Sequence, residues 1–358
     1  MEYKNRSVVI IGFGGMGSSW AESFSTQGGE ISAIVDPDPS AEESVSQYNA
    51  SLYSSLESMP TKLSEEVWCI ATPSESHIEY LREAIKRGVN DVLVEKPVTT
   101  APMEAKDLDF SSVRGSVDFI ELEHPVVKTI LKHISESDFE LGGAVHWRGK
   151  TSRKIRPYIL DDMVHDISEI FALYNFLEYE KSGISVADVK NVTDWSETER
   201  VDDSFSEGAH DVSGTVLLEG FNNESICFKG GFNQRNERRY FLWVDENYET
   251  AYFGSTIRRD HLTPTACKIT GWKNVCNSIE TCLKGDIRND IEISDFIESV
   301  DGKVIQSGST ANDGLSRMEL IASNILSGEK SPADIKLGLL ADELIYEIYQ
   351  QQNTVDPY

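Results

Sequence analysis

Three polar residues of this sequence, Lys96, Asp161 and His165, have the types that proton and charge transfer require. A histidine exchanges a proton near neutral pH and can act as a general base. A lysine ammonium can stabilise the charge of a developing alkoxide. Asp161 precedes His165 by four residues, about one helical turn, so both can project from one helix face. These groups suit the oxidation of an alcohol, provided that a hydride acceptor binds beside them.

A glycine-rich turn near the N-terminus predicts a binding site for such a hydride acceptor. It fits the GxGxxG pattern between an apolar run and a helical pattern, and its residues are Gly12, Phe13, Gly14, Gly15, Met16 and Gly17. Such a turn lets backbone approach a pyrophosphate at the positive end of a helix. Asp36 ends the next strand, where a carboxylate accepts hydrogen bonds from an adenosine ribose. We expect NAD rather than NADP, because Asp36 would repel a 2′-phosphate and no arginine follows it.

The first 120 residues alternate strand and helix patterns, which predicts an α/β Rossmann domain with a parallel sheet. The expected strands are 7–12, 30–36, 67–73, 91–95 and 116–122, and the expected helices after the first are 51–59, 76–88 and 101–110. Ligands of such sheets lie beyond the carboxyl ends of the strands. The nicotinamide side of the site is therefore expected to be lined by the residues that end two strands, Ala71, Thr72 and Pro73 and then Glu95 and Lys96.

Four segments in this order resemble the glucose–fructose oxidoreductase and inositol dehydrogenase family, Gfo/Idh/MocA. They are ATPxxxH at 71–77, VEKP at 94–97, VDFIELEHPVV at 117–127 and ILDDMVHDIS at 159–168. The resemblance implies that Lys96 lies near both the nicotinamide and the substrate hydroxyl, and that Asp161 and His165 complete the site. It also implies that a cis bond before Pro97 helps to aim the lysine.

Other residues of these segments are left with open roles. His77 is interpreted as a helix-start residue near the cofactor, and His124 as a contact to cofactor or substrate or simply part of a turn. Met163 stands where the family usually has a small residue, and Leu122, Glu123 and His124 replace Arg-Phe-Asn. These departures leave the identity of the substrate open.

A basic segment, WRGKTSRKIRP at 147–157, precedes the predicted catalytic helix. Arg148, Arg153 and Arg156 could bind an anionic group of a substrate, since arginine pairs with carboxylates and phosphates in a bidentate way. The alternative is a solvated loop, or a patch that pairs with acidic surface on the same or a neighbouring subunit.

Two domains are expected for 358 residues: an NAD-binding domain at 1–122 and a substrate-binding and oligomerisation α+β domain at 123–358. In the second, strand patterns at 142–149, 213–220, 225–232, 238–245 and 249–254 predict an open, mainly antiparallel sheet. In the family this sheet mediates a homodimer or homotetramer. Helices are expected at 313–326 and 332–351, the latter packing back on the first domain.

Composition excludes several classes of protein. The net charge of −27 argues against nucleic-acid binding, although it also suits a salty cytoplasm. Five cysteines without CxxC spacing argue against a disulfide framework or a metal site. No apolar run approaches the roughly 20 residues that span a bilayer, and the first residues lead directly into a strand, so we expect a cytoplasmic protein.

The sequence as a whole predicts an NAD-dependent oxidoreductase that acts on a ring hydroxyl of a sugar, cyclitol or sugar nucleotide. One alternative is a glycoside hydrolase or lyase on the same fold, in which NAD is recycled. The other is a nucleotide-dependent sensor without turnover.

Overall fold

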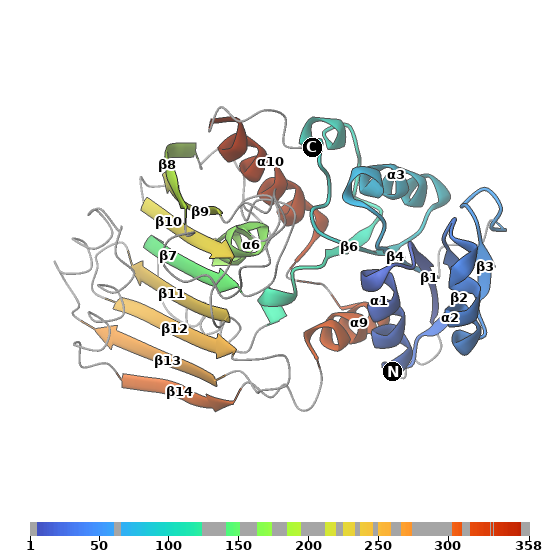
Figure 1. The fold of residues 1–358 in the computed structure, drawn as a ribbon, viewed down its shortest axis with the longest axis horizontal. Coiled ribbons are helices and arrows are strands. Elements are labelled where there is room, and N and C mark those ends of the chain that lie inside the picture. The colour runs from blue at the N-terminus through green and yellow to red at the C-terminus, as the bar shows by residue number, and fades with distance from the viewer. Residues whose placement is uncertain are drawn as a thin grey trace. The chain divides into compact units, whose positions relative to one another are not determined.

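The computed structural model describes fourteen parts of the chain, which are residues 6–60, 66–123, 141–150, 163–173, 185–194, 212–219, 225–232, 237–245, 250–258, 266–273, 303–309, 316–329, 331 and 333–351. They divide into two compact units (Figure 1). The first unit contains Met1–Glu123, Asn312–Glu343 and Tyr358, and the second contains His124–Ala311 and Leu344–Pro357. The first unit thus includes a segment from the C-terminal part of the chain.

A six-stranded parallel sheet forms the centre of the first unit. Its strands are β1 (Ser7–Ile11), β2 (Glu30–Val35), β3 (Ser51–Tyr53), β4 (Val67–Ile70), β5 (Asp91–Val94) and β6 (Arg114–Val117), in the order β3-β2-β1-β4-β5-β6. The order changes direction between β1 and β4. In doubly wound folds that point opens a crevice at the carboxyl ends of the strands, which is where ligands bind.

Helices cover both faces of this sheet. On one face, α1 (Gly15–Thr26) and α9 (Arg317–Ser327) share a buried cluster with Cys69 and Leu93 of the sheet. On the other face, α3 (His77–Arg87) contacts β4 and β5, and α10 (Ile335–Gln351) brings Gly338 against Val98 and Val117. The predicted Rossmann layout is confirmed, because a parallel sheet whose strands are buried on both faces needs a helical layer on each.

Two predicted helices are wrong. The segment 51–59 forms β3, whose backbone pairs with β2, and then a turn in which Ser58 Oγ donates to the carbonyl oxygen of Ser55 at 2.7 Å. The segment 101–110 forms only a short 3₁₀ helix at Pro102–Ala105, and Asp109 then accepts the N–H of Ser111 at 2.9 Å. Serine and aspartate side chains compete with helical backbone bonds, and β2 offers β3 a ladder of new ones.

The amino-terminal edge of the sheet is tied together by one buried carboxylate. Asp91, at the start of β5, is 3% exposed and accepts two hydrogen bonds from Arg114, at 2.7 and 2.9 Å, and another from Arg6. Arg6 also donates to the carbonyl oxygen of Ile325 in α9, at 3.0 Å. Burial alone would raise the pKa of Asp91, but the hydrogen bonds from Arg114 and Arg6 outweigh it and lower the pKa.

The second unit contains an eight-stranded sheet in the order β14-β13-β12-β11-β7-β10-β9-β8. The bounds are β7 (Leu141–Lys150), β8 (Ser185–Asp194), β9 (Val212–Glu219), β10 (Ser225–Phe232), β11 (Glu237–Asp245), β12 (Thr250–Arg258), β13 (Ala266–Lys273) and β14 (Lys303–Ser309). β7 and β10 are parallel, and the other neighbouring pairs are antiparallel. Helix α6 (Met163–Leu173) belongs to the same unit.

Shorter helical segments complete the described chain. They are α2 (Glu42–Val45) and the 3₁₀ helices at Pro39–Ala41, Ser46–Tyr48, Ser74–Ser76 and Ile120–Glu123. Among the described residues, no helix has the length and apolar character that a membrane crossing requires.

Candidate active site

The glycine-rich turn joins β1 to α1 in a conformation that its glycines dictate. Gly12 has a φ of +85°, and a Cβ there would lie 2.7 Å from the carbonyl oxygen of Ala71. A Cβ on Gly17 would lie 1.9 Å from the carbonyl oxygen of Gly12. At Gly14 and Gly15 the same position is open, with no atom within 4 Å. The first and last glycines therefore allow close packing, whereas the middle ones leave backbone at the start of α1 accessible to a ligand.

Asp36, directly after β2, is bonded to this turn. Its Oδ2 accepts the N–H of Phe13 at 2.6 Å, and its Oδ1 accepts the N–H of Asp38 at 2.8 Å. Both carboxylate oxygens keep a further lone pair for other donors. The carboxylate is thereby oriented beside the glycine turn, as hydroxyl binding at that place would require.

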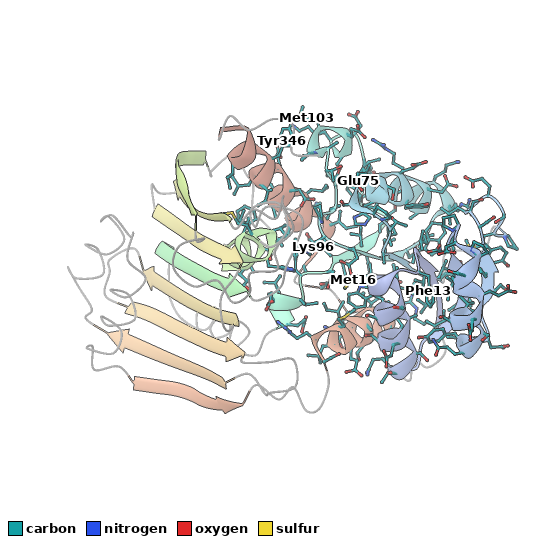
Figure 2. The ribbon with its side chains drawn as sticks, viewed as in Figure 1. Phe13, Met16, Glu75, Lys96, Met103 and Tyr346 are labelled. Atoms are coloured by element: carbon teal, nitrogen blue, oxygen red, sulfur yellow. The ribbon has the colours of Figure 1, made fainter. Side chains whose placement is uncertain are left out.

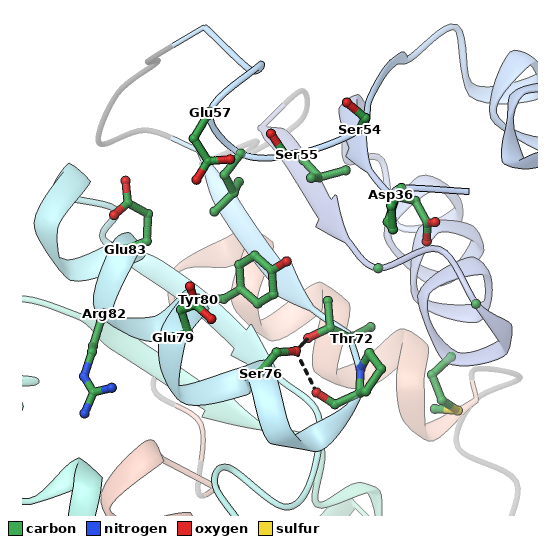
Figure 3. A pocket seen from close by; sticks show the side chains of 18 of the residues that line it. Asp36, Ser54, Ser55, Glu57, Thr72, Ser76, Glu79, Tyr80, Arg82 and Glu83 are labelled. Carbon is green, nitrogen blue, oxygen red and sulfur yellow. Dashed lines mark hydrogen bonds between the residues drawn. The ribbon is translucent and has the colours of Figure 1, made fainter. Parts of the chain in front are cut away.

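A cleft of about 920 Å³ lies along the glycine turn and the ends of β2 and β4 (Figure 3). That volume is in the range of small-molecule sites, about 300 to 1,000 Å³. Eight of the predicted cofactor residues line it: Gly12, Gly14, Gly15, Met16, Asp36, Ala71, Thr72 and Pro73. Figure 3 also shows Ser76, whose hydroxyl bonds to Thr72 Oγ1 at 2.9 Å and to the Pro73 carbonyl oxygen at 2.8 Å.

Five predicted cofactor residues lie outside the lining of this cleft. Phe13 packs its ring edge-on against Tyr48, and Gly17 packs within the glycine turn. His77, Glu95 and Lys96 belong instead to the segments that follow β4 and β5. Figure 2 labels Phe13 and Met16 in the region of α1, and Lys96 follows β5 in the chain.

The segment that carries Lys96 is joined to the segment after β4 by His77. One ring nitrogen, Nδ1, lies 2.7 Å from the carbonyl oxygen of Pro97, and the other, Nε2, lies 2.8 Å from that of Thr72. The Lys96–Pro97 peptide bond is cis, as the resemblance implies. His77 therefore links the segment after β4 to the turn after β5, in which Lys96 directly precedes Pro97.

A pair of buried carboxyl groups accompanies Lys96. The strand register pairs Val94 with Val117, so Glu95 and Asp118 are neighbours just beyond β5 and β6. Glu95 is 7% exposed and accepts the indole N–H of Trp20 at 2.7 Å. Burial, then the charge of Glu95 and a hydrogen bond to it, raise the pKa of Asp118 well above its usual range. Burial and the neighbouring Glu95 therefore oppose ionisation of the Asp118 carboxyl group.

The sequence patterns did not identify Asp118 and Trp20 as members of this region. Asp118 had one usable signal, since it is an acidic residue within the predicted strand at 116–122. Trp20 had none, because nothing in the spacing of 75 residues between Trp20 and Glu95 predicts their contact.

The remaining predicted site residues belong to the second unit or lie outside the described residues. His165 is in α6 and is 3% exposed, and its carbonyl oxygen accepts the hydroxyl of Ser168 at 2.7 Å. Arg148 is in β7, where the backbone alone is described. His124, Arg153, Arg156 and Asp161 lie outside the described residues. The convergence of Lys96 with Asp161 and His165 therefore stays a prediction.

Comparison with known proteins agrees with the fold. Residues 6–112 match the Gfo/Idh/MocA family model, described as "Oxidoreductase family, NAD-binding Rossmann fold". No curated protein matches the sequence.

Several solved structures share the fold along nearly the whole chain. UDP-N-acetylglucosamine 3-dehydrogenase from Acidithiobacillus ferrooxidans is 14% identical with a TM-score of 0.65, and 98% of each chain is covered. A levoglucosan dehydrogenase in complex with NADH is 16% identical with a TM-score of 0.65, again with 98% of each chain covered. A dehydrogenase from Chromobacterium violaceum is 14% identical with a TM-score of 0.64, covering 97% of this chain and 95% of its own. The motifs and the parallel sheet agree with the match of residues 6–112 to the Gfo/Idh/MocA oxidoreductase family model.

Proposed function

We propose that this protein is an NAD-dependent oxidoreductase that transfers a hydride between nicotinamide and a ring hydroxyl or ketone of a sugar, cyclitol or sugar nucleotide. One observation carries the proposal. The cleft runs from the glycine turn and Asp36 to Thr72, and His77 bonds Thr72 to the segment of Lys96. The cleft and the turn that carries the Lys96 ammonium thus lie in one unit and are connected by hydrogen bonds.

The residues of the cleft fit a dinucleotide. The open positions at Gly14 and Gly15 would let the backbone at the start of α1 approach the pyrophosphate, and the carboxylate of Asp36 would accept the ribose hydroxyls. When bound, the nicotinamide ring accepts or donates the hydride.

Charges around the cleft favour NAD over NADP. Asp36, Glu57, Glu79 and Glu83 line it together with two basic residues, Arg82 and Lys86. Both basic side chains have acidic partners: Lys86 Nζ lies 3.1 Å from a Glu83 carboxylate oxygen, and Arg82 lies 3.8 Å from that of Glu104. A 2′-phosphate beside Asp36 would meet net negative charge, which opposes its binding.

The chemistry divides among three side chains. Lys96 would stabilise the alkoxide that forms as the carbinol carbon loses its hydride. His165 would take the hydroxyl proton, and Asp161 would orient the imidazole or bind a substrate hydroxyl. Lys96 follows β5, and His165 lies on α6.

We also infer the role of the second part of the chain. An α+β domain from residue 123 onward, with its mainly antiparallel sheet, would bind the substrate and form the contacts of a homodimer or homotetramer. Arg148, Arg153 and Arg156 would gather an anionic group, which agrees with a neighbour whose name specifies a sugar nucleotide. Replacing Arg153 and Arg156 by alanine should then raise KM for an anionic sugar much more than for a neutral one.

Absorbance of NADH tests the proposal directly. The purified protein is incubated with NAD or NADP and a panel of neutral sugars, cyclitols, sugar acids and nucleotide sugars. Formation of NADH with one class of substrate, and a higher kcat/KM for NAD than for NADP, would support it. Product without net NADH would instead indicate hydrolysis or elimination with recycled cofactor. Binding of NAD without turnover of any substrate would favour a sensor.

A further inference from the structure

The turn that follows Lys96 is held by side chains from two distant helices. Within it, Val98 and Thr99 are 0% and 1% exposed, so their backbone groups have no access to water. Pro97 has no N–H, and the strand ladder of β5 ends before it. Buried backbone groups need partners, and here they must come from outside the turn.

His77 supplies one partner from the start of α3. Both of its ring nitrogens face carbonyl oxygens, those of Pro97 and Thr72, at 2.7 and 2.8 Å. A carbonyl oxygen only accepts, so the imidazole holds these segments through its ring N–H. His77 is 1% exposed, so its ring lies enclosed between the two segments.

Asp342 supplies the other partner from α10. Its Oδ2 accepts the N–H of Thr99 at 2.9 Å, across 243 residues of sequence. Asp342 is 4% exposed, and its Oδ1 has no hydrogen-bond partner. Burial raises the pKa of Asp342 to about 8, although N–H bonds from Thr99 and Val98 oppose the rise. Because Asp342 is buried, its carboxyl group binds the backbone of the turn and not water.

We propose that His77 and Asp342 are positioning residues for Lys96. His77 holds the carbonyl group of Pro97, and Asp342 holds the amide of Thr99. The proposal rests on the proposed catalytic role of Lys96. An ammonium on a flexible side chain can act on one carbon only if its backbone is fixed, and a displacement of about 1 Å can reduce a rate about 100-fold. The two anchors come from α3 and α10, so the position of Lys96 depends on both.

Paired variants of Asp342 test the anchor from α10. Asp342→Leu keeps the size but removes the acceptor, and Asp342→Asn keeps a carbonyl acceptor. We expect Asp342→Leu to lower kcat about 30-fold with KM for NAD little changed, and Asp342→Asn to restore most of that loss. Asp91→Asn, at the other end of β5, is the control, because it should reduce stability without lowering kcat.

Two further measurements do not depend on activity. Hydrogen exchange at the Thr99 amide should be faster in Asp342→Leu than in Asp342→Asn. Exchange at the Thr99 amide should also be faster in His77→Ala than in wild type, because the Pro97 carbonyl oxygen loses its partner. Unchanged Thr99 exchange in His77→Ala, or unchanged Thr99 exchange with unchanged kcat in Asp342→Leu, would overturn the proposal. If Asp342→Leu does not fold, the exchange rates in His77→Ala and Asp342→Asn decide.

These outcomes separate the anchors from the proposed reaction. Should Lys96→Met keep full activity while the Thr99 and His77 measurements turn out as expected, the anchors exist but the role of Lys96 is wrong. Should Lys96→Met lose activity while those measurements fail, the reaction stands and the anchors are wrong.

Discussion

The two ends of the parallel sheet in the first unit treat buried charge in opposite ways. At the amino-terminal end, the carboxylate of Asp91 meets two guanidinium groups, and its pKa is lowered. At the carboxyl-terminal end, Asp118 lies beside another carboxyl group and Asp342 binds backbone amides, and the pKa of each is raised. One end of the sheet thus has a carboxylate whose pKa is lowered by its arginine partners. The other end has carboxyl groups whose pKa is raised by burial.

The difference separates stabilisation from function. A carboxylate paired with two arginines stabilises the fold, since it links β1, β5 and β6 at one place. Carboxyl groups whose burial is not compensated lower stability, and such groups concentrate at functional sites. In this protein they lie beside Lys96 and the turn after it. Substitutions at the two ends should therefore have different effects, one on stability and the other on activity.

The largest expected effect is that of Lys96→Met. Loss of the ammonium should lower kcat about 1,000-fold, or about 4 kcal/mol, because one charged group would no longer stabilise the alkoxide. Steady-state kinetics with the best substrate of the panel gives the value, and urea denaturation should show unchanged stability. Lys106→Met, an exposed lysine paired with Glu343 at 3.6 Å, is the control. A wild-type kcat in Lys96→Met would show that the carboxyl-terminal end of the sheet takes no part in the reaction.

Asp91→Asn should have the next largest effect, on stability alone. Removing the carboxylate leaves two arginines without their buried partner and should cost about 3 kcal/mol. The folded-state pKa of Asp91 is depressed, so its stabilisation is full above the ordinary value of 3.8 and is lost as pH falls through the folded value. Urea denaturation should therefore show that the free energies of unfolding of Asp91→Asn and wild type differ less at pH 3 than at pH 7. A loss of kcat at equal folded fraction would contradict the separation of the two ends.

Asp36→Ala should weaken cofactor binding by about 2 kcal/mol, or about 30-fold, because hydrogen bonds to a charged group are lost. The affinity for NADP should fall much less, which narrows the preference for NAD. Fluorescence titration with NADH and NADPH measures both. Asp38→Ala is the matched control, because Asp38 lies in the same segment and its carboxylate accepts the N–H of Ser40 at 2.8 Å. Equal losses for both cofactors would show that Asp36 does not discriminate between them.

Asp342→Asn should change how the free energy of unfolding depends on pH. Asp342 holds its proton in the folded protein up to a pKa of about 8, whereas the unfolded chain releases it near 3.8. Between these values wild-type stability should fall by about 1.4 kcal/mol per pH unit from this group. The amide variant lacks this pH dependence. Its free energy of unfolding, measured by urea denaturation, should therefore increase relative to that of wild type between pH 5 and pH 7. Parallel curves would show that Asp342 is ionised in the folded protein.

Local pattern predicted much of the first unit. The strands at 7–12 and 30–36 match β1 and β2 within one residue at their ends, because apolar β-branched runs and glycine turns are local signals. The strand predicted at 67–73 ends at Ile70, and that at 116–122 corresponds to Arg114–Val117. The errors at 51–59 and 101–110 arose where the sheet edge or side-chain bonds decided between turn, strand and helix.

The sequence alone determined the glycine turn, the acidic end of β2 and the placement of Lys96 after a buried strand, because each depends on neighbours within a few residues. Only the tertiary structure brought Trp20 to Glu95, Arg6 to Asp91, and Asp342 to Thr99. Those contacts join residues that are 75, 85 and 243 positions apart. No local pattern encodes them, because a buried polar group takes whichever partner the packing of distant elements delivers to it.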